Sequence, residues 1–147
     1  MPVTKIRTKW SSGDLVFTDE ADNEIARFDS TNDAFCRKNK LEHHSASDTL
    51  TVAESGSVHT NLGASGVVEL TLPQTPAAGV YYDFVVMAAQ ELRPNPGAGG
   101  GIYISGAKQA DDKFITANDE AESVRLTADG NGDWIASSMV GTWGVES

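Results

Sequence analysis

Asp129, Asn131 and Asp133 occupy alternate positions in the stretch ADGNGDW, as the first ligands of a calcium-binding loop would. An EF-hand loop that begins at Asp129 would need glycine at its sixth position and a bidentate glutamate at its twelfth. Trp134 and Val140 stand there instead. Because Asp, Asn and Gly favour tight turns, we predict that DGNG connects the two strands of a hairpin and binds no calcium ion.

The histidines are the other candidate metal ligands. His43 and His44 are adjacent, so on an extended chain their side chains point to opposite sides and cannot bind one ion together. His59 lies in a separate segment, and a zinc site would need a carboxylate or thiolate from elsewhere in the chain. We interpret the histidines as solvated residues and expect no metal or other cofactor. The alternative is a metal on a symmetry axis, where copies of one histidine meet.

No combination of nucleophile, base and acid indicates an enzyme. GASG at residues 63–66 departs from the G-x-S-x-G motif and precedes a strand-like segment instead of following one. Cys36 could pair with His43 or His44, but a free cysteine is usually a small buried apolar residue. Carboxylates cluster in turn-like stretches, and the glycine-rich segment lacks the Lys-Ser/Thr pair of a phosphate-binding loop. We therefore expect a non-enzymatic protein.

Composition narrows the function classes further. The chain has 147 residues, with 21 acidic and 11 basic side chains and a formal net charge of -10. This charge repels phosphate backbones and argues against direct nucleic-acid binding. No apolar run approaches the length that spans a bilayer, and the first residues lack the apolar core of a signal peptide. We expect a soluble protein made in the cytoplasm, without membrane contact and, with Cys36 alone, without an intrachain disulfide.

We expect β-strands to position the candidate residues named above. Apolar side chains recur at every second position in short segments bounded by Gly, Asn, Asp or Pro. Residues 80–92 are long enough for a helix, but their β-branched and aromatic side chains favour a buried strand. Residues 93–101, RPNPGAGGG, predict an exposed loop without regular structure. The expected strands are residues 5–10, 14–19, 24–29, 49–53, 67–73, 80–89, 101–106, 123–128 and 133–140.

The chain changes character near RKNKLEHHSASD, and we place a domain boundary there. We predict an all-β protein in which residues 1–46 form a short N-terminal β-hairpin arm and residues 47–147 form an antiparallel β-sandwich or jelly-roll-like domain. An isolated hairpin is marginally stable in water. The arm must therefore lean on the main domain, on other copies of itself or on another protein.

Three stretches resemble parts of a known group of proteins. Residues 55–106 contain TNLGASG, LTLP and PAAG followed by YYDFVV, and residues 123–143 close with GDW and GTW. In this order the motifs resemble a β-rich module of tailed-bacteriophage structural proteins. KWSSGDLVFTDEADNEIARFD, residues 9–29, looks like the β arm that opens many small phage virion proteins. The resemblance implies a virion structural role, either in capsid decoration or in a tail fibre or spike, and carries over no catalytic residues.

The chain lacks the heptads and repeats that extend a tail fibre. The resemblance then implies a capsid decoration, or cement, protein made in the host cytoplasm. We expect it to bind the major capsid protein on the outer capsid surface as a homotrimer and to stabilise contacts between coat subunits. The residues expected to contact the capsid and neighbouring copies are Trp10, Phe17, Ile25 and Phe28.

Two other hypotheses remain. In the first, the chain is a tail fibre, tip or adaptor protein that contacts the host surface and binds glycans, with Trp134, Trp143 or Tyr103 as stacking platforms. The competing interpretation of these side chains is that they pack in a core, as aromatic residues of alternating strands usually do. In the second, the chain is a glycan-degrading tailspike, but the sequence shows no carboxylate pair for that reaction.

Overall fold

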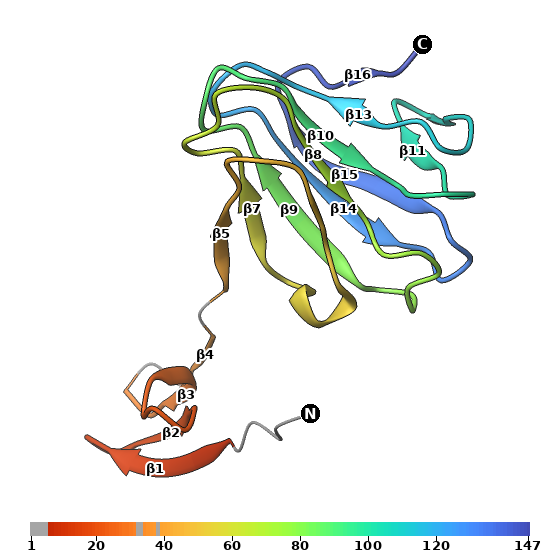
Figure 1. Ribbon diagram of the computed structural model, residues 1–147. Coiled ribbons are helices and arrows are strands. Elements are labelled where there is room, and N and C mark those ends of the chain that lie inside the picture. Colours follow the sequence, from red (N-terminus) through yellow and green to blue (C-terminus); the bar gives the residue numbers. More distant parts are fainter. Residues whose placement is uncertain (1–5, 32–33, 38) are drawn as a thin grey trace. The chain divides into compact units, whose positions relative to one another are not determined.

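The computed structural model describes residues 6–31, 34–37 and 39–147, which belong to two compact units, residues 1–39 and 40–147 (Figure 1). The all-β fold class is confirmed, since the regular elements of the described residues are strands apart from one 3-10 turn, Val52–Glu54. Among these residues no helix has the length and apolar character needed to cross a membrane. The units divide earlier than we predicted from the sequence, because Leu41–His43 already form a strand of the large unit.

The N-terminal unit is a four-stranded antiparallel meander with the strand order β1-β2-β3-β4. Ser12 and Gly13, with φ of 53° and 91°, turn the chain between the first two strands, as the two central residues of a tight hairpin require. We predicted a short hairpin arm in this region. The observed sheet is larger, because residues 34–37 form a further strand that pairs with residues 24–29. The strands are β1 (Arg7–Ser11), β2 (Asp14–Thr18), β3 (Glu24–Asp29) and β4 (Ala34–Arg37).

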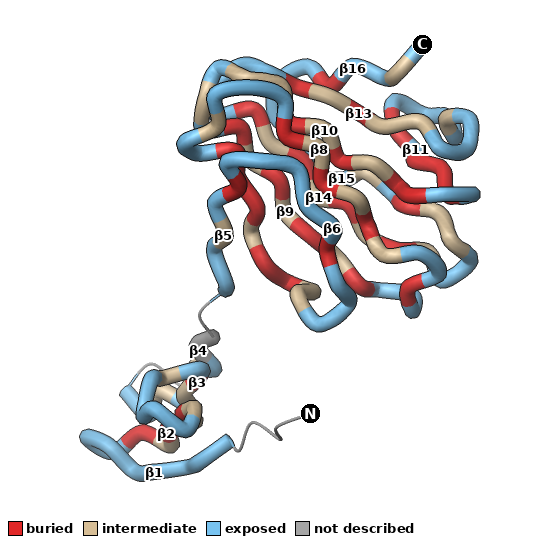
Figure 2. Tube along the Cα trace, in the orientation of Figure 1, coloured by how far each residue is buried: buried red, intermediate tan, exposed pale blue. Residues whose placement is uncertain are grey.

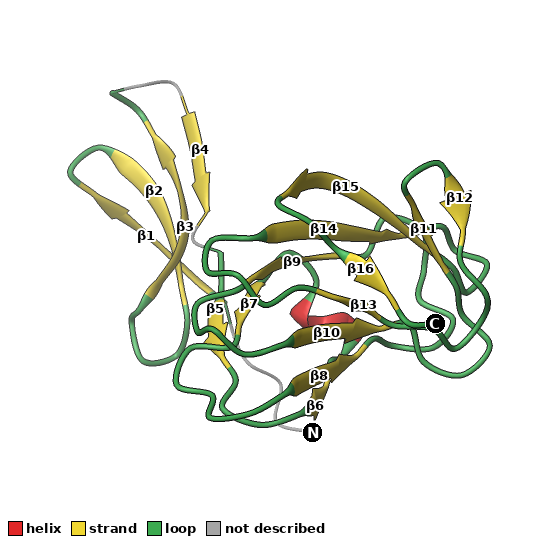
Figure 3. Ribbon diagram, turned by 90° about the horizontal axis from the view of Figure 1, so that it is seen from above, coloured by secondary structure: helices red, strands yellow, loops and turns green. Residues whose placement is uncertain are grey.

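The large unit is a β-sandwich (Figure 3). One sheet has the order β12-β11-β15-β14-β9-β7-β5, the other has the order β10-β8-β6, and β13 pairs with β16. The strands are β5 (Leu41–His43), β6 (Asp48–Thr49), β7 (Val58–Thr60), β8 (Val68–Thr71), β9 (Tyr81–Val85), β10 (Leu92–Asn95), β11 (Ile102–Ile104), β12 (Ala107–Lys108), β13 (Ile115–Thr116), β14 (Ser123–Ala128), β15 (Trp134–Val140) and β16 (Gly144–Val145).

The pairing within the sandwich is mixed, in contrast to the antiparallel pairing that we predicted. From β5 to β10, successive strands alternate between the two sheets. Every second strand therefore joins the same sheet, and it runs in the same direction as the strand two elements before it. Therefore β5, β7 and β9 pair in parallel, as do β6, β8 and β10. The antiparallel hairpin of β14 and β15 then extends the larger sheet beside β9. A coil of alternating strands produces parallel neighbours without helical crossovers.

The core lies between the two sheets and follows the alternation expected from the sequence. Buried residues recur at every second position of β8, β9, β10 and β14 (Figure 2). Tyr82, Phe84 and Leu126 are fully buried, and so is Trp134 from the neighbouring β15. The aromatic rings of Tyr82 and Trp134 lie 5.7 Å apart between their centroids. Burial of such aromatic side chains is the main stabilising contribution in a core of this size.

Two of the expected elements are wrong. Residues 93–101 were predicted to be an exposed loop, but Leu92–Asn95 form β10 and Pro94 is buried in it. Proline is tolerated because β10 is the last strand of its sheet, and the bridge on its other edge joins Ala117 to Leu92, two residues before Pro94. Gly100 is also buried, and an added Cβ there would lie 2.7 Å from the Gly132 carbonyl oxygen. Of residues 49–53, only Thr49 is in a strand, and the chain then enters the 3-10 turn.

Candidate docking surface

One row of the N-terminal sheet is apolar across all four strands. Trp10 pairs with Leu15, Leu15 with Phe28, and Phe28 with Phe35. Directly opposed residues of antiparallel strands point to the same side of a sheet, so these four side chains share one face. Trp10, Phe28 and Phe35 are 75%, 51% and 57% exposed. The face is therefore a stripe of large apolar side chains in contact with water.

A shallow groove runs along the same face, and every residue that lines it is apolar. The Phe28 ring is at its centre, 6.1 Å from the Phe17 ring and 4.9 Å from the Phe35 ring between centroids. Exposed apolar patches on soluble proteins mark surfaces that bind a partner. The lining residues are Ile6, Phe17, Ile25, Ala26, Phe28 and Phe35.

The opposite face of this sheet is charged and internally paired. Arg27 lies beside Val16 in the register and contacts Glu24 and Asp14, with Nη1 3.2 Å from the Asp14 carboxylate. The backbone N–H and the hydroxyl of Ser30 both donate to Asp14, and with Arg27 they lower the pKa of this carboxyl group. Lys9 pairs with Asp22 at 2.7 Å. The sheet is thus amphipathic, with paired charges on one side and unpaired apolar surface on the other.

The structure brings together the contact residues that we predicted from the sequence. Phe17, Ile25 and Phe28 line the groove, and Trp10 lies in the apolar row beside it. Ile6 and Phe35 belong to the same surface and were missed, although alternation in β4 could have identified Phe35. A role of these residues in capsid contact stays a prediction.

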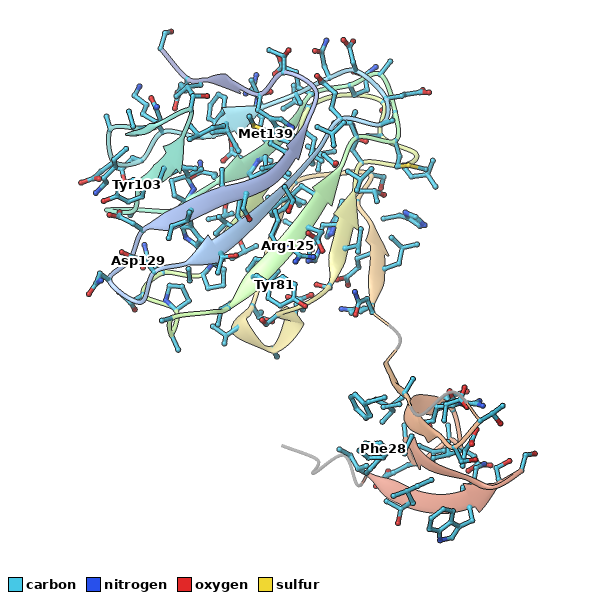
Figure 4. All side chains as sticks on the ribbon, turned by 180° about the vertical axis from the view of Figure 1, so that it is seen from behind. Phe28, Tyr81, Tyr103, Arg125, Asp129 and Met139 are labelled. Carbon is cyan, nitrogen blue, oxygen red and sulfur yellow. The ribbon has the colours of Figure 1, made fainter. Side chains whose placement is uncertain are left out.

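The hairpin turn predicted at DGNG is confirmed (Figure 4, Asp129). Asp129 Oδ1 accepts hydrogen bonds from the backbone N–H groups of Asn131 at 2.6 Å and Asp133 at 3.1 Å. These bonds lower the pKa of Asp129. The Asp133 carboxylate points elsewhere, because it accepts from Gly101 N at 2.9 Å and pairs with Lys108 at 2.9 Å. The three side chains therefore serve the turn and its neighbours.

The interpretation of the histidines as solvated residues is wrong for two of them. His59 is fully buried on β7 and His44 is 7% exposed. His44 Nε2 lies 3.0 Å from His59 Nδ1. His43 does point to the other side of the strand, where its Nδ1 contacts Thr60 Oγ1 at 2.7 Å. Sequence separation hid this pair, since only the parallel register of β5 and β7 brings the two rings together.

The three aromatic residues considered as sugar-stacking platforms differ in how exposed they are. Trp134 and Trp143 are 0% and 6% exposed, so the interpretation of both as core residues is confirmed. Trp143 Nε1 donates to the Ser123 carbonyl at 3.1 Å, which fixes the C-terminal segment to β14. Tyr103, on β11, is 42% exposed and is the one of the three that a ligand could reach (Figure 4).

Comparisons with known proteins identify no relative: no family model matches the chain, and no curated protein sequence matches it.

Proposed function

We propose that this chain is a non-enzymatic structural protein of a tailed-bacteriophage virion, namely a capsid decoration protein that binds the outer capsid surface through its N-terminal sheet. The observation that carries the proposal is the exposed apolar row of Trp10, Leu15, Phe28 and Phe35. The motif order in residues 55–143 supplies the resemblance to virion proteins.

Energetics support a docking role for this face. Burying a large apolar side chain contributes roughly 1.5–3 kcal/mol, so covering Trp10, Phe28 and Phe35 would stabilise a complex by several kcal/mol. The N-terminal unit needs such a partner, because its buried hydrophobic residues among those described are Val16 and Ala26 alone. A single-layer sheet buries little apolar surface until another surface covers its hydrophobic face.

The partner in this proposal is the major capsid protein, together with neighbouring copies of the chain in a homotrimer. Strands β1 and β4 end the N-terminal sheet and can each accept an additional strand from a neighbour. A trimer would present three apolar faces to one site on the shell, and linked contacts of this kind raise the overall affinity well above that of one contact. The net charge of -10 favours separate, soluble copies before assembly.

Co-sedimentation with capsids that lack this chain tests the proposal. The informative variant is Phe28→Asp, which places a charge at the centre of the groove. Lys9→Gln is the matched control, because it changes the net charge by the same amount on the opposite face of the same sheet. We expect Phe28→Asp to weaken capsid binding at least about tenfold, as the loss of one buried anchor does, and Lys9→Gln to bind as the wild type does. Equal binding by wild type and Phe28→Asp would contradict the proposal.

A further inference from the structure

Two adjacent strands of the large unit, with the residue that follows the first, gather three potential metal ligands on one face (Figure 1, β5 and β7). Glu42 and His59 are register partners in the parallel pair of β5 and β7. His44 lies two residues after Glu42, so the alternation of an extended chain places both on the same side. One oxygen of Glu42 and one ring nitrogen of each histidine lie within 4.8 Å of one another.

Hydrogen bonds around His59 determine which of its nitrogens carries a proton. Ser57 Oγ donates its single proton to the Glu54 carbonyl oxygen, which can only accept. His59 Nε2 lies 2.7 Å from Ser57 Oγ and must therefore donate to it. Nδ1 of neutral His59 is left with a free lone pair directed at His44 and Glu42. Metal-binding histidines are commonly oriented in this way, by a hydrogen bond from the nitrogen that does not bind the metal.

His44 has a corresponding partner for its second nitrogen. Its Nε2 lies 3.0 Å from His59 Nδ1, and its Nδ1 lies 3.6 Å from the Asp48 carboxylate. Without a metal, His44 Nε2–H donates to His59. If the proton moves to Nδ1, it faces Asp48 and the lone pair of Nε2 becomes available. A carboxylate behind a metal-bound histidine is a recurrent feature of zinc sites.

Glu42 supplies the third ligand atom. Its Oε1 pairs with Lys40 at 2.7 Å, whereas its Oε2 is buried, 3.8 Å from His59 Nδ1, and has no hydrogen-bond partner within the part of the chain that the structure describes. A buried carboxylate oxygen without a partner is costly, and a cation would satisfy it. The Glu42 side chain is 31% exposed, which leaves an entry path for an ion.

We propose that Glu42, His44 and His59 form a binding site for a divalent transition-metal ion of the zinc type. Two imidazole nitrogens and one carboxylate oxygen form a ligand set that zinc uses in proteins, with the fourth position left to water. Ligand atoms of a tetrahedral zinc ion lie roughly 3.3 Å apart. The separations of His59 Nδ1 from His44 Nε2, 3.0 Å, and from Glu42 Oε2, 3.8 Å, lie on either side of that value. The ion would fasten β5, the edge strand of its sheet, to β7.

Calorimetric titration of the full-length, tag-free protein with Zn²⁺ tests this site, with Co²⁺ absorption as a second readout of tetrahedral coordination. The informative variants are His44→Gln and Glu42→Gln. The matched control is His43→Gln, which removes a histidine from the same strand on its opposite face. Two ligand variants are used so that a folding defect in one does not remove the test.

We expect the wild type and His43→Gln to bind one Zn²⁺ per chain and to melt at a higher temperature when Zn²⁺ is present. Both ligand variants should bind at least about tenfold more weakly, the minimum lost when even a supporting residue of a metal site is removed. Absence of saturable Zn²⁺ binding to the wild type would overturn the proposal. So would equal weakening in His43→Gln and His44→Gln, because the ion would then not depend on the buried face of the β5–β7 pair.

Discussion

His44 Nε2 and His59 Nδ1 lie 3.0 Å apart and share a hydrogen bond across the β5–β7 pair. The direction of this bond follows from Ser57, which accepts from His59 Nε2 and leaves Nδ1 as the acceptor. One proton thus lies between two buried rings at the position where a metal ion could bind both nitrogens.

We predict that both buried histidines are protonated on Nε2 when the protein is free of metal. Long-range ¹⁵N–¹H correlation spectra of the chelator-treated protein should show this tautomer for His44 and His59. Addition of Zn²⁺ should switch His44 to the Nδ1–H form while His59 keeps its proton on Nε2, because Ser57 still accepts it. A spectrum in which His44 keeps the same tautomer after saturation with Zn²⁺ would contradict the proposed ligand atoms.

Gly141, between β15 and β16, should tolerate replacement by alanine less well than Gly63 does. Its φ of +81° disfavours any side chain, and an added Cβ would overlap the carboxyl group of Glu122. Gly63 has a similar φ of +84°, but apart from its chain neighbours no atom of the described residues lies within 4 Å of the added Cβ. We expect Gly63→Ala to cost about 1–2 kcal/mol of unfolding free energy from backbone strain. Gly141→Ala should cost roughly 1–3 kcal/mol more from the steric overlap.

Urea denaturation of both alanine variants measures this difference, since each midpoint shift converts to a change in unfolding free energy. Equal losses in the two variants would mean that Glu122 moves away without cost. We do not expect this, because Glu122 accepts a hydrogen bond from Thr142 N at 2.6 Å and another from Asp119 N at 3.1 Å.

Glu122 should make stability depend on pH in the acidic range. The backbone N–H of Thr142 is the main cause that lowers its pKa below the ordinary value of 4.5, with further bonds from Asp119 and Asn118. The unfolded chain therefore binds a proton at a higher pH than the folded chain does. The stabilisation is present above pH 4.5 and is lost as the pH falls through the lower, folded pKa.

Denaturation midpoints measured between neutral and acidic pH test this dependence. Glu122→Gln should reduce the stability lost on acidification, because the variant has no carboxyl group to protonate at this position. Glu120→Gln, at an exposed position two residues earlier, is the control and should follow the wild-type curve. If Glu122→Gln and the wild type lose equal stability on acidification, the N–H groups around Glu122 do not stabilise its charged form.

The N-terminal unit should open more readily than the large unit in the unassembled protein. Amides of β2 and β3 are supported by few buried apolar contacts, whereas β9 and β14 lie over the aromatic core. Amide hydrogen exchange measured by mass spectrometry should therefore be faster in peptides from residues 14–29 than in those from residues 81–85 and 123–128. Capsid binding should slow exchange in the first group only. Equal protection of both groups in the free protein would contradict this stability difference.

Alternation in single strands was enough to predict the strands that enclose the core. Residues 80–89 and 123–128 each place an apolar side chain at every second position, and β9 and β14 bury those side chains. The prediction of a loop at residues 93–101 was wrong at Pro94, because a proline indicates a loop unless the strand is known to lie at a sheet edge. Parallel pairing was also missed, since it depends on the alternation of whole strands between sheets and leaves no short-range pattern.

The two candidate sites also differ in how far the sequence could predict them. The apolar face of the N-terminal sheet could be predicted because Phe17 and Phe28 belong to neighbouring strands joined by a short loop. The three-residue ligand set could not, since His59 meets Glu42 only through a parallel register. The i, i+2 spacing of Glu42 and His44 was the available signal, and adjacent His43 obscured it.

Immunogold electron microscopy of intact phage particles whose genome encodes this chain tests the central claim most directly. Antibody raised against the large unit, which would stay exposed after the N-terminal sheet docks, is the suitable probe. Gold label spaced regularly over the head is the predicted result for a capsid decoration protein. Label confined to the tail, or particles without label, would contradict it.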